Sequence, residues 1–196
     1  MIRKGNRAAR SPDATGRQRA HWKRIAQKIH KDVCRHGVDK KRRCFVQAYG
    51  STNMDASLLL LPLVGFLPAS DPRIKATVRE IEKRLTFKGL VARYNTSSGV
   101  DGLPPGEGAF LACSFWLADN YILMGQRTKA ARLFGKLQRL ANDVGLYAEE
   151  YDPREKRMLG NFPQAFSHVA LINTALSLMT DGEKRKQERR DAHRKS

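Results

Sequence analysis

Helical spacing of apolar residues is the feature that most constrains how this chain can fold. Apolar side chains recur every three or four residues, as in helices that bury one face, and no segment shows the apolar–polar alternation of a strand. The sequence therefore predicts an all-α fold. Its six helices are expected at residues 17–36, 55–66, 71–89, 108–124, 128–142 and 163–179.

The lengths of the connections predict where a functional face would lie. Short connections join the second helix to the third and the fourth to the fifth, whereas long ones follow the first, third and fifth. If each helix reverses direction, the three long loops emerge at the same end of the molecule. That end would gather Gln47 and Tyr49, then Arg93, Tyr94 and Glu107, then Glu149, Glu150 and Tyr151.

Two adjacent carboxylates, Glu149 and Glu150, lie among the tyrosines of the last long loop. Carboxylates and aromatic rings on a loop are the usual materials of a sugar-binding site. The same residues also suit a plain connector between helices whose acids are simply hydrated. Spacing alone leaves both interpretations open.

The formal charge of +18 is concentrated at the two ends of the chain. Residues 1–43 carry 15 Lys/Arg against 3 acids, and residues 181–196 carry 7 against 4. Such ends can neutralise phosphates, but the Arg-rich start has no interleaved aromatics, so nucleic-acid binding is the less favoured reading. We expect disordered segments at 1–16 and 181–196 around a helical body at 17–180.

Several functional classes are not indicated by the sequence. The longest apolar run, 58–67, is shorter than a membrane span and contains a proline, and no apolar export signal follows the basic start. The cysteines, at positions 34, 44 and 113, are odd in number and lack CxxC spacing. We therefore expect a cytoplasmic protein with reduced thiols, no metal site and no cofactor.

Several motifs, in order, resemble glycoside hydrolase family 15, the family of glucoamylases, glucodextranases and bacterial trehalases. The resemblance covers about residues 19–178 and is greatest to bacterial members. It is carried by Tyr49-Gly-Ser, Leu58-Leu-Leu-Leu-Pro-Leu-Val-Gly-Phe-Leu-Pro68, Asp101-Gly-Leu-Pro-Pro-Gly-Glu-Gly-Ala-Phe110, Cys113-Ser-Phe-Trp116, Glu149-Glu-Tyr-Asp-Pro153 and Gly160-Asn-Phe-Pro-Gln-Ala-Phe-Ser-His168.

The resemblance implies a fold, a reaction and a set of site residues. The family fold is a barrel of six helix pairs, and this chain resembles the C-terminal half, with about three helix hairpins. The family inverts the anomeric centre of α-glucosides, and Glu149 matches its general base. Arg93 and Tyr94 match an Arg-Tyr motif that contacts the sugar, and the resemblance further suggests Glu107, Glu150 and Tyr151 for substrate binding.

The family's general acid, a glutamate that follows a tryptophan, has no counterpart among these residues, nor has the Arg-Asp segment that holds the sugar. The sequence thus suggests a truncated enzyme that lacks the acid. The alternatives are a non-catalytic carbohydrate-binding remnant and one half of a split enzyme. Because half a barrel leaves open flanks, we expect a homodimer or a separately encoded N-terminal half to cover the Leu58–Leu61 run and the aromatics Phe110, Phe115 and Trp116.

Other conspicuous side chains are expected to be structural. His168 follows an aromatic residue on an apolar helix and has no metal-ligand partner at a suitable spacing. Phe115 and Trp116 are expected to pack in the core, and Cys113 is expected to be an unreactive buried thiol.

Overall fold

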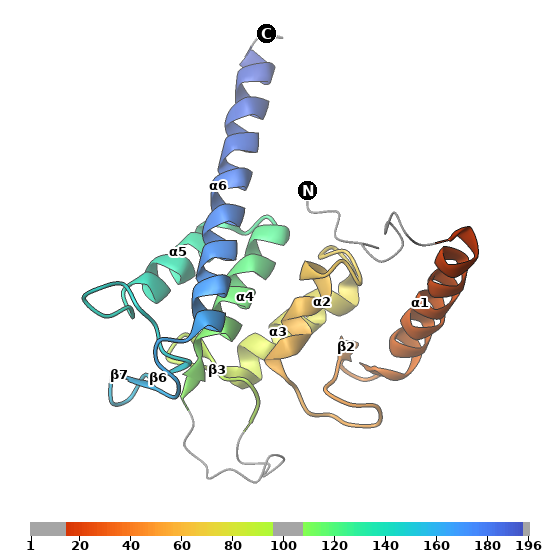
Figure 1. Cartoon of the computed structure of the whole chain (residues 1–196), viewed down its shortest axis with the longest axis horizontal. Helices are drawn as coiled ribbons and strands as arrows, with labels where there is room; N and C mark the ends of the chain where they lie inside the picture. Colours follow the sequence, from red (N-terminus) through yellow and green to blue (C-terminus); the bar gives the residue numbers. More distant parts are fainter. Residues whose placement is uncertain (1–14, 96–107, 194–196) are drawn as a thin grey trace.

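The chain folds into a helical array with short two- and three-residue strands at one end (Figure 1). The computed structural model describes residues 15–95 and 108–193. Its elements are α1 (Gly16–His36), β1 (Val38–Asp39), β2 (Cys44–Phe45), η2 (Ala56–Leu59), α2 (Leu60–Leu63), α3 (Pro72–Leu85), β3 (Thr86–Phe87), β4 (Leu90–Val91), β5 (Ala109–Phe110), α4 (Leu111–Leu123), α5 (Arg127–Gln138), β6 (Glu150–Asp152), β7 (Arg157–Leu159) and α6 (Ala165–His193).

Local sequence signals determine where several helices begin. Thr15 and Gln18 form a capping box at the start of α1, in which each side chain hydrogen-bonds the other residue's backbone N–H. Asp71 caps α3 through the N–H of Arg73, and Pro72 occupies the first helical turn, where a missing N–H does no harm. Asp55 caps η2 in the same way, through the N–H of Ser57.

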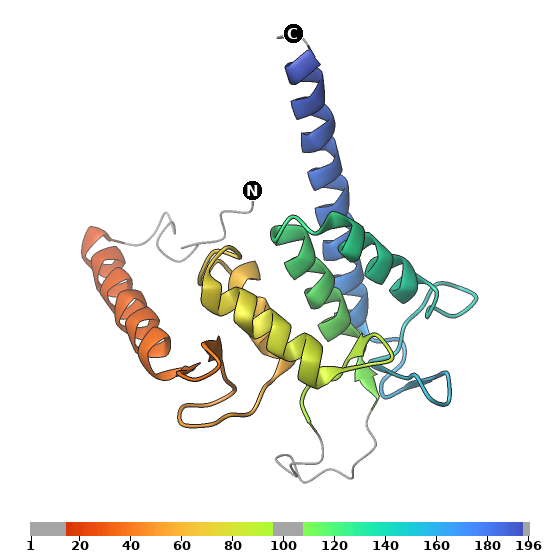
Figure 2. The same ribbon diagram turned by 180° about the vertical axis from the view of Figure 1, so that it is seen from behind.

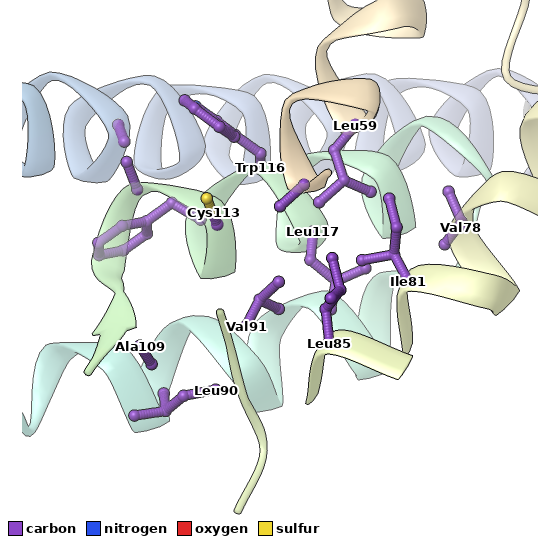
Figure 3. Close-up of a cluster of buried hydrophobic side chains, with 14 of the residues drawn as sticks. Leu59, Val78, Ile81, Leu85, Leu90, Val91, Ala109, Cys113, Trp116 and Leu117 are labelled. Atoms are coloured by element: carbon purple, nitrogen blue, oxygen red, sulfur yellow. The ribbon is translucent and has the colours of Figure 1, made fainter. Parts of the chain in front are cut away.

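Helix α4 is the centre of the fold. Every residue from Leu111 to Tyr121 is buried, so this helix is enclosed on all sides. It packs against α5, α6, η2 and β4. Figure 3 shows Trp116, Leu117 and Cys113 of α4 within a cluster that includes Ile81 of α3. Burying one such large apolar side chain contributes about 1.5–3 kcal/mol to stability.

The loops emerge as the sequence predicts. In both Figure 1 and Figure 2 the segment after β2, the end of β4 and the β6–β7 hairpin lie at one end of the helices. The short connections from α2 to α3 and from α4 to α5 lie at the other end. The all-α prediction and the topology of alternating helices are both confirmed.

Three small antiparallel ladders were not predicted. β1 pairs with β2, and β3 pairs with β4. β5, β6 and β7 form a three-stranded sheet in which Ala109 faces Tyr151 and Glu150 faces Leu159. Residues in these ladders are not available to the neighbouring helices, which are therefore shorter than predicted. α3 ends at Leu85 rather than near Gly89, and α4 begins at Leu111 rather than at Gly108.

Two further expectations are wrong. Helix α6 does not end near Met179 but continues to His193. The apolar residues expected at an open flank are largely covered. Phe115 is fully buried and Trp116 is only 7% exposed, which confirms the expectation that these two rings pack in the core. Among the helices of the described residues, none is long and apolar enough to cross a membrane.

Candidate active site

The site is built around the backbone of Glu149, which extends the β5–β6–β7 sheet by one residue. Its carbonyl accepts a 3.1 Å hydrogen bond from the N–H of Leu111, and its own N–H donates to the carbonyl of Asn161 at 2.9 Å. Glu149 is thereby fixed between the first turn of α4 and the segment that leads into α6. Since α4 and α6 pack against each other, this carboxylate is held by the rigid part of the fold.

The side chain of Glu149 is held by the two residues that follow β7. Asn161 donates to Glu149 Oε2 from its side-chain amide at 2.9 Å and from its backbone N–H at 3.4 Å. Gly160 has a φ of 74°, and a Cβ there would lie 3.0 Å from the Cβ and 3.1 Å from Oε2 of Glu149. Position 160 therefore favours glycine for two reasons: its backbone is left-handed, and the side chain of Glu149 lies too close for a Cβ.

Glu150 lies beside the chain that leads into β5. Its Oε2 accepts a 3.0 Å hydrogen bond from the N–H of Gly108, and its backbone pairs with Phe110. A Cβ at position 108 would come within 3.2 Å of the Glu150 side chain. The two adjacent glutamates thus have different partners.

Arg93 is oriented by Asp55, a residue that the sequence analysis placed only at the start of a helix. The guanidinium Nε donates to Asp55 Oδ1 at 3.0 Å, and the N–H of Ala56 donates to the carbonyl of Arg93 at 2.8 Å. A β-bridge between Asp55 and Tyr94 completes the contact. Burial acts to lower the pKa of Arg93, but the hydrogen bond and charge of Asp55 outweigh it and raise that pKa.

The pKa of the buried Cys113 thiol is affected by charges from both groups of residues. Burial is the main reason its pKa is raised far above the ordinary value, and Asp55 and Glu150 raise it further while Arg93 opposes them. The charges from the Arg93 loop and from β6 therefore act on one point of α4. A thiol with so high a pKa stays protonated, as expected for an unreactive packing residue.

The other predicted site residues are only partly brought together. Gln47 and Tyr94 line one small pocket of about 100 Å³, together with Asn53, Met54, Arg84, Leu85 and Asn95. Tyr49 instead donates a 2.8 Å hydrogen bond to Asp32 on α1. Tyr151 is half-buried and packs against the core. Glu107 lies outside the described residues.

Aromatic side chains lie along the same end of α4 and α6. The ring of Phe166 is 6.1 Å from that of Phe110 and 5.6 Å from that of Trp116, yet Phe166 remains 47% exposed. Phe162, which follows Asn161 directly, is 52% exposed. Both residues belong to the Gly160–His168 motif, but the sequence analysis did not identify them as site residues.

His168 has the structural role expected of it. Its Nε2 accepts a hydrogen bond from the N–H of Tyr147 at 3.3 Å, so its Nδ1 carries the proton that bonds the Gln164 carbonyl at 2.7 Å. Within residues 15–95 and 108–193, no group of three or more His, Cys, Asp or Glu side chains is arranged to hold a metal ion.

Solved structures establish the class of fold. A wild-type glycosidase superposes with a TM-score of 0.71 at 24% identity, covering 89% of this chain and 47% of that one. A glycosidase variant in complex with glucose gives a TM-score of 0.70 at 23% identity, covering 84% and 46%. The chain thus has the helical fold of these glycosidases. The model for glycosyl hydrolases family 15 matches residues 3–176, and the chain belongs to that family.

Its relatives include trehalases. The trehalase of Mycolicibacterium smegmatis is 49% identical over 158 residues, which are 81% of this chain and 24% of the relative. The trehalase of Thermoplasma volcanium is 44% identical over 158 residues, covering 80% of this chain and 25% of that one. The chain therefore spans about a quarter of the length of these relatives.

Proposed function

We propose that this chain supplies the general-base side of a family 15 active site that hydrolyses an α-glucoside, with trehalose as the first candidate. Trehalose is suggested by relatives that are named trehalases. The observation that carries the proposal is the environment of Glu149. Asn161 holds its Oε2, whereas Oε1 makes no hydrogen bond to any residue in the described ranges. One oxygen is thus oriented while the other is available to water.

The reaction needs a base and an acid on opposite sides of the glycosidic bond. Glu149 Oε1 takes a proton from a water molecule as that water's oxygen bonds to the anomeric carbon and the glycosidic bond breaks. The bonding electrons leave with the glycosidic oxygen, which receives a proton from the general acid. In inverting enzymes the two carboxyl groups are roughly 6.5–9.5 Å apart, so the water fits between base and sugar.

The neighbouring residues are suited to holding the sugar. Arg93 is fixed through Nε by Asp55, and its side chain is still 42% exposed, so it can donate hydrogen bonds to sugar hydroxyls. We assign Tyr94, Glu150 and Tyr151 to the same substrate face, and Glu107 by resemblance alone. We further propose that the acid comes from a part of the catalytic domain outside these 196 residues, because no Trp-Glu acid motif occurs among them.

A reconstitution assay tests this function. The chain is co-expressed with the part of the Mycolicibacterium smegmatis trehalase that it does not match, and glucose release from trehalose is measured. We expect turnover from the pair and none from the chain alone. Glu149→Gln should lower turnover by about 10²–10⁴-fold, the usual contribution of an acid or base.

The matched control is Glu155→Gln, which alters an exposed carboxylate in the turn between β6 and β7 and should leave turnover unchanged. Equal turnover of Glu149→Gln and the unaltered pair would show that Glu149 is not the base. Trehalose binding without hydrolysis by a well-assembled pair would favour the non-catalytic carbohydrate-binding alternative.

A further inference from the structure

An exposed aromatic ring lies beside two cations at the end of the fold that carries the loops. Phe87 of β3 is 47% exposed. The centre of its ring lies 5.7 Å from the ammonium of Lys88 and 5.1 Å from the guanidinium carbon of Arg154. Folding thus places an aromatic residue among cations, a combination that the Arg-rich start of the chain lacks.

Hydrogen bonds fix this arrangement. The Lys88 ammonium donates to the carbonyl of Pro153 at 3.3 Å, which joins the turn after β3 to the turn between β6 and β7. The ammonium of Lys136, from α5, donates in turn to the carbonyl of Lys88. Figure 1 shows β3 next to β6. We refer to Phe87, Lys88, Lys136 and Arg154 as the Phe87 patch.

Neighbouring acids do not neutralise the patch. None of its three cations forms an ion pair with a carboxylate of the residues that the structure describes. Lys156 and Arg157, both exposed, add two more cations in and after the same turn. Of the two acids there, Asp152 shapes the turn, because its Oδ1 accepts hydrogen bonds from the N–H groups of Arg154 and Glu155 at 2.8 and 3.3 Å. Positive charge therefore predominates around the exposed ring.

Single-stranded nucleic acid is the ligand that matches this combination. Unpaired bases stack on aromatic rings and on guanidinium planes, while Lys and Arg side chains neutralise the adjacent phosphates. A double helix offers phosphates but no free base faces. An anionic membrane surface would also attract the cations, but insertion needs a broad apolar face, and the patch exposes a single ring. The formal charge of +18 adds long-range attraction for any polyanion.

We propose that the Phe87 patch binds single-stranded nucleic acid. An unpaired base stacks on Phe87 and Arg154, and the neighbouring phosphates pair with Lys88 and Lys136. The inference does not rest on the proposed hydrolysis, since none of these four residues is assigned to the substrate face. The basic ends of the chain attract phosphates as well, but they are the same in every variant of the patch and so do not affect a comparison between variants.

The test measures binding by fluorescence anisotropy. The full chain is titrated into fluorescein-labelled oligouridylate or oligothymidylate of about 20 nucleotides at several KCl concentrations. Phe87→Ser should weaken binding about fivefold or more, because a stacked base is lost. The slope of log K against log salt should not change, because no phosphate contact is lost. Phe87→Leu should bind as weakly as Phe87→Ser, whereas Phe87→Tyr, which keeps a flat ring, should bind like the unaltered chain.

The phosphate contacts have their own signature. Lys88→Gln/Lys136→Gln keeps donors for the two carbonyls but removes two charges, and should reduce the magnitude of the salt slope by roughly 1.4, about 0.7 for each phosphate contact in a single strand. The matched control is Lys28→Gln/Lys75→Gln, which removes two exposed lysines of α1 and α3 outside the patch. Its slope should equal that of the unaltered chain. Tighter binding of oligouridylate than of oligothymidylate would identify RNA rather than DNA as the ligand.

A duplex of the same length separates stacking from charge. Its bases already stack on one another, so Phe87→Ser should bind the duplex like the unaltered chain, and circular dichroism melts should show that all variants keep their helices. Equal affinity of Phe87→Ser and the unaltered chain for both single strands would overturn the proposal, because binding would then come from the basic ends. Equal salt slopes of the patch pair and the control pair would also overturn it. So would loss of binding by Phe87→Ser to vesicles of anionic phospholipid with no loss on oligonucleotides, since the patch would then be a membrane surface.

Discussion

Asn161 and Glu149 are joined by hydrogen bonds between their backbones and between their side chains. The Glu149 N–H donates to the Asn161 carbonyl at 2.9 Å, and the Asn161 amide donates to Glu149 Oε2 at the same distance. The orientation of the proposed base therefore depends on one neighbour that lies twelve residues away in the sequence.

Replacing that neighbour tests the dependence directly. Asn161→Leu keeps the approximate shape of the side chain but removes its hydrogen bond to a charged group, an interaction that typically contributes about 1.5–3 kcal/mol. In the reconstituted enzyme we expect kcat to fall by roughly 10–100-fold with KM little changed, because the base acts in the chemical step. A rise in KM at constant kcat would show instead that Asn161 helps to bind the sugar.

Gly160 offers a second test with a close control. Gly160→Ala places a methyl group 3.0 Å from the Glu149 Cβ at a φ of 74°, whereas Gly145→Ala meets no atom within 4 Å at a φ of 81°. The left-handed backbone costs either variant about 1–2 kcal/mol of stability. Thermal melts should therefore show a loss for both variants, larger for Gly160→Ala because of the close contact, while only Gly160→Ala lowers trehalose turnover. Equal activity of the two variants would mean that the close approach to Glu149 is unimportant.

The longer helices could be predicted from the sequence because each has a long apolar repeat, whereas the helix expected at 55–66 is only the short pair η2 and α2, over residues 56–63. The strands could not, since two or three residues such as Glu150–Asp152 are too few to show alternation. The long extent of α6 was missed because the charged residues after Met179 have no apolar face to mark a helix. Exposed apolar surface was expected on the aromatic residues of α4. It lies on α6 instead, because α4 is enclosed by α5, α6 and η2, whereas one face of α6 is uncovered.

The candidate site, too, could be predicted only in part from the sequence. Glu149 and Arg93 could be selected because they lie in motifs that resemble a known family. Asp55 and Asn161, which orient them, could not, because the contact between Asp55 and Arg93 spans 38 residues and no local pattern records it. Residues that act through a partner become visible only once the chain is folded.

Asp55 combines two roles that different substitutions separate. Its side chain both caps η2 and holds Arg93. Asparagine is as good a cap as aspartate but carries no charge, so Asp55→Asn should keep the cap and lose only the stability that comes from the ion pair with Arg93. Asp55→Ala should lose about 1 kcal/mol or more. Both variants should raise KM for trehalose in the reconstituted enzyme, because Arg93 is no longer fixed. An unchanged KM in both would remove Arg93 from the substrate face.

The burial of Asp119 predicts an unusual dependence of the protein's stability on pH. It lies on α4 beside Thr174 of α6 and is 7% exposed, and its Oδ1 has no hydrogen-bond partner in the described structure. Burial raises the pKa of Asp119 from 3.8 to about 7, and the hydrogen bond with Thr174 opposes this only in part. Below about pH 4 the carboxyl is protonated in both the folded and the unfolded chain. Between about pH 4 and pH 7 only the folded chain keeps the proton.

The contribution of Asp119 to the free energy of unfolding should therefore fall as pH rises from about 4 to about 7, and stay constant above that range. A shift of this size corresponds to at most roughly 4 kcal/mol. Asp119→Asn has no such titration, so the unaltered protein should lose stability relative to the variant across that interval. Urea denaturation of both proteins between pH 4 and 8 measures the difference. Parallel curves would show that Asp119 is not desolvated, and hence that α4 and α6 pack less tightly around it than the structure indicates.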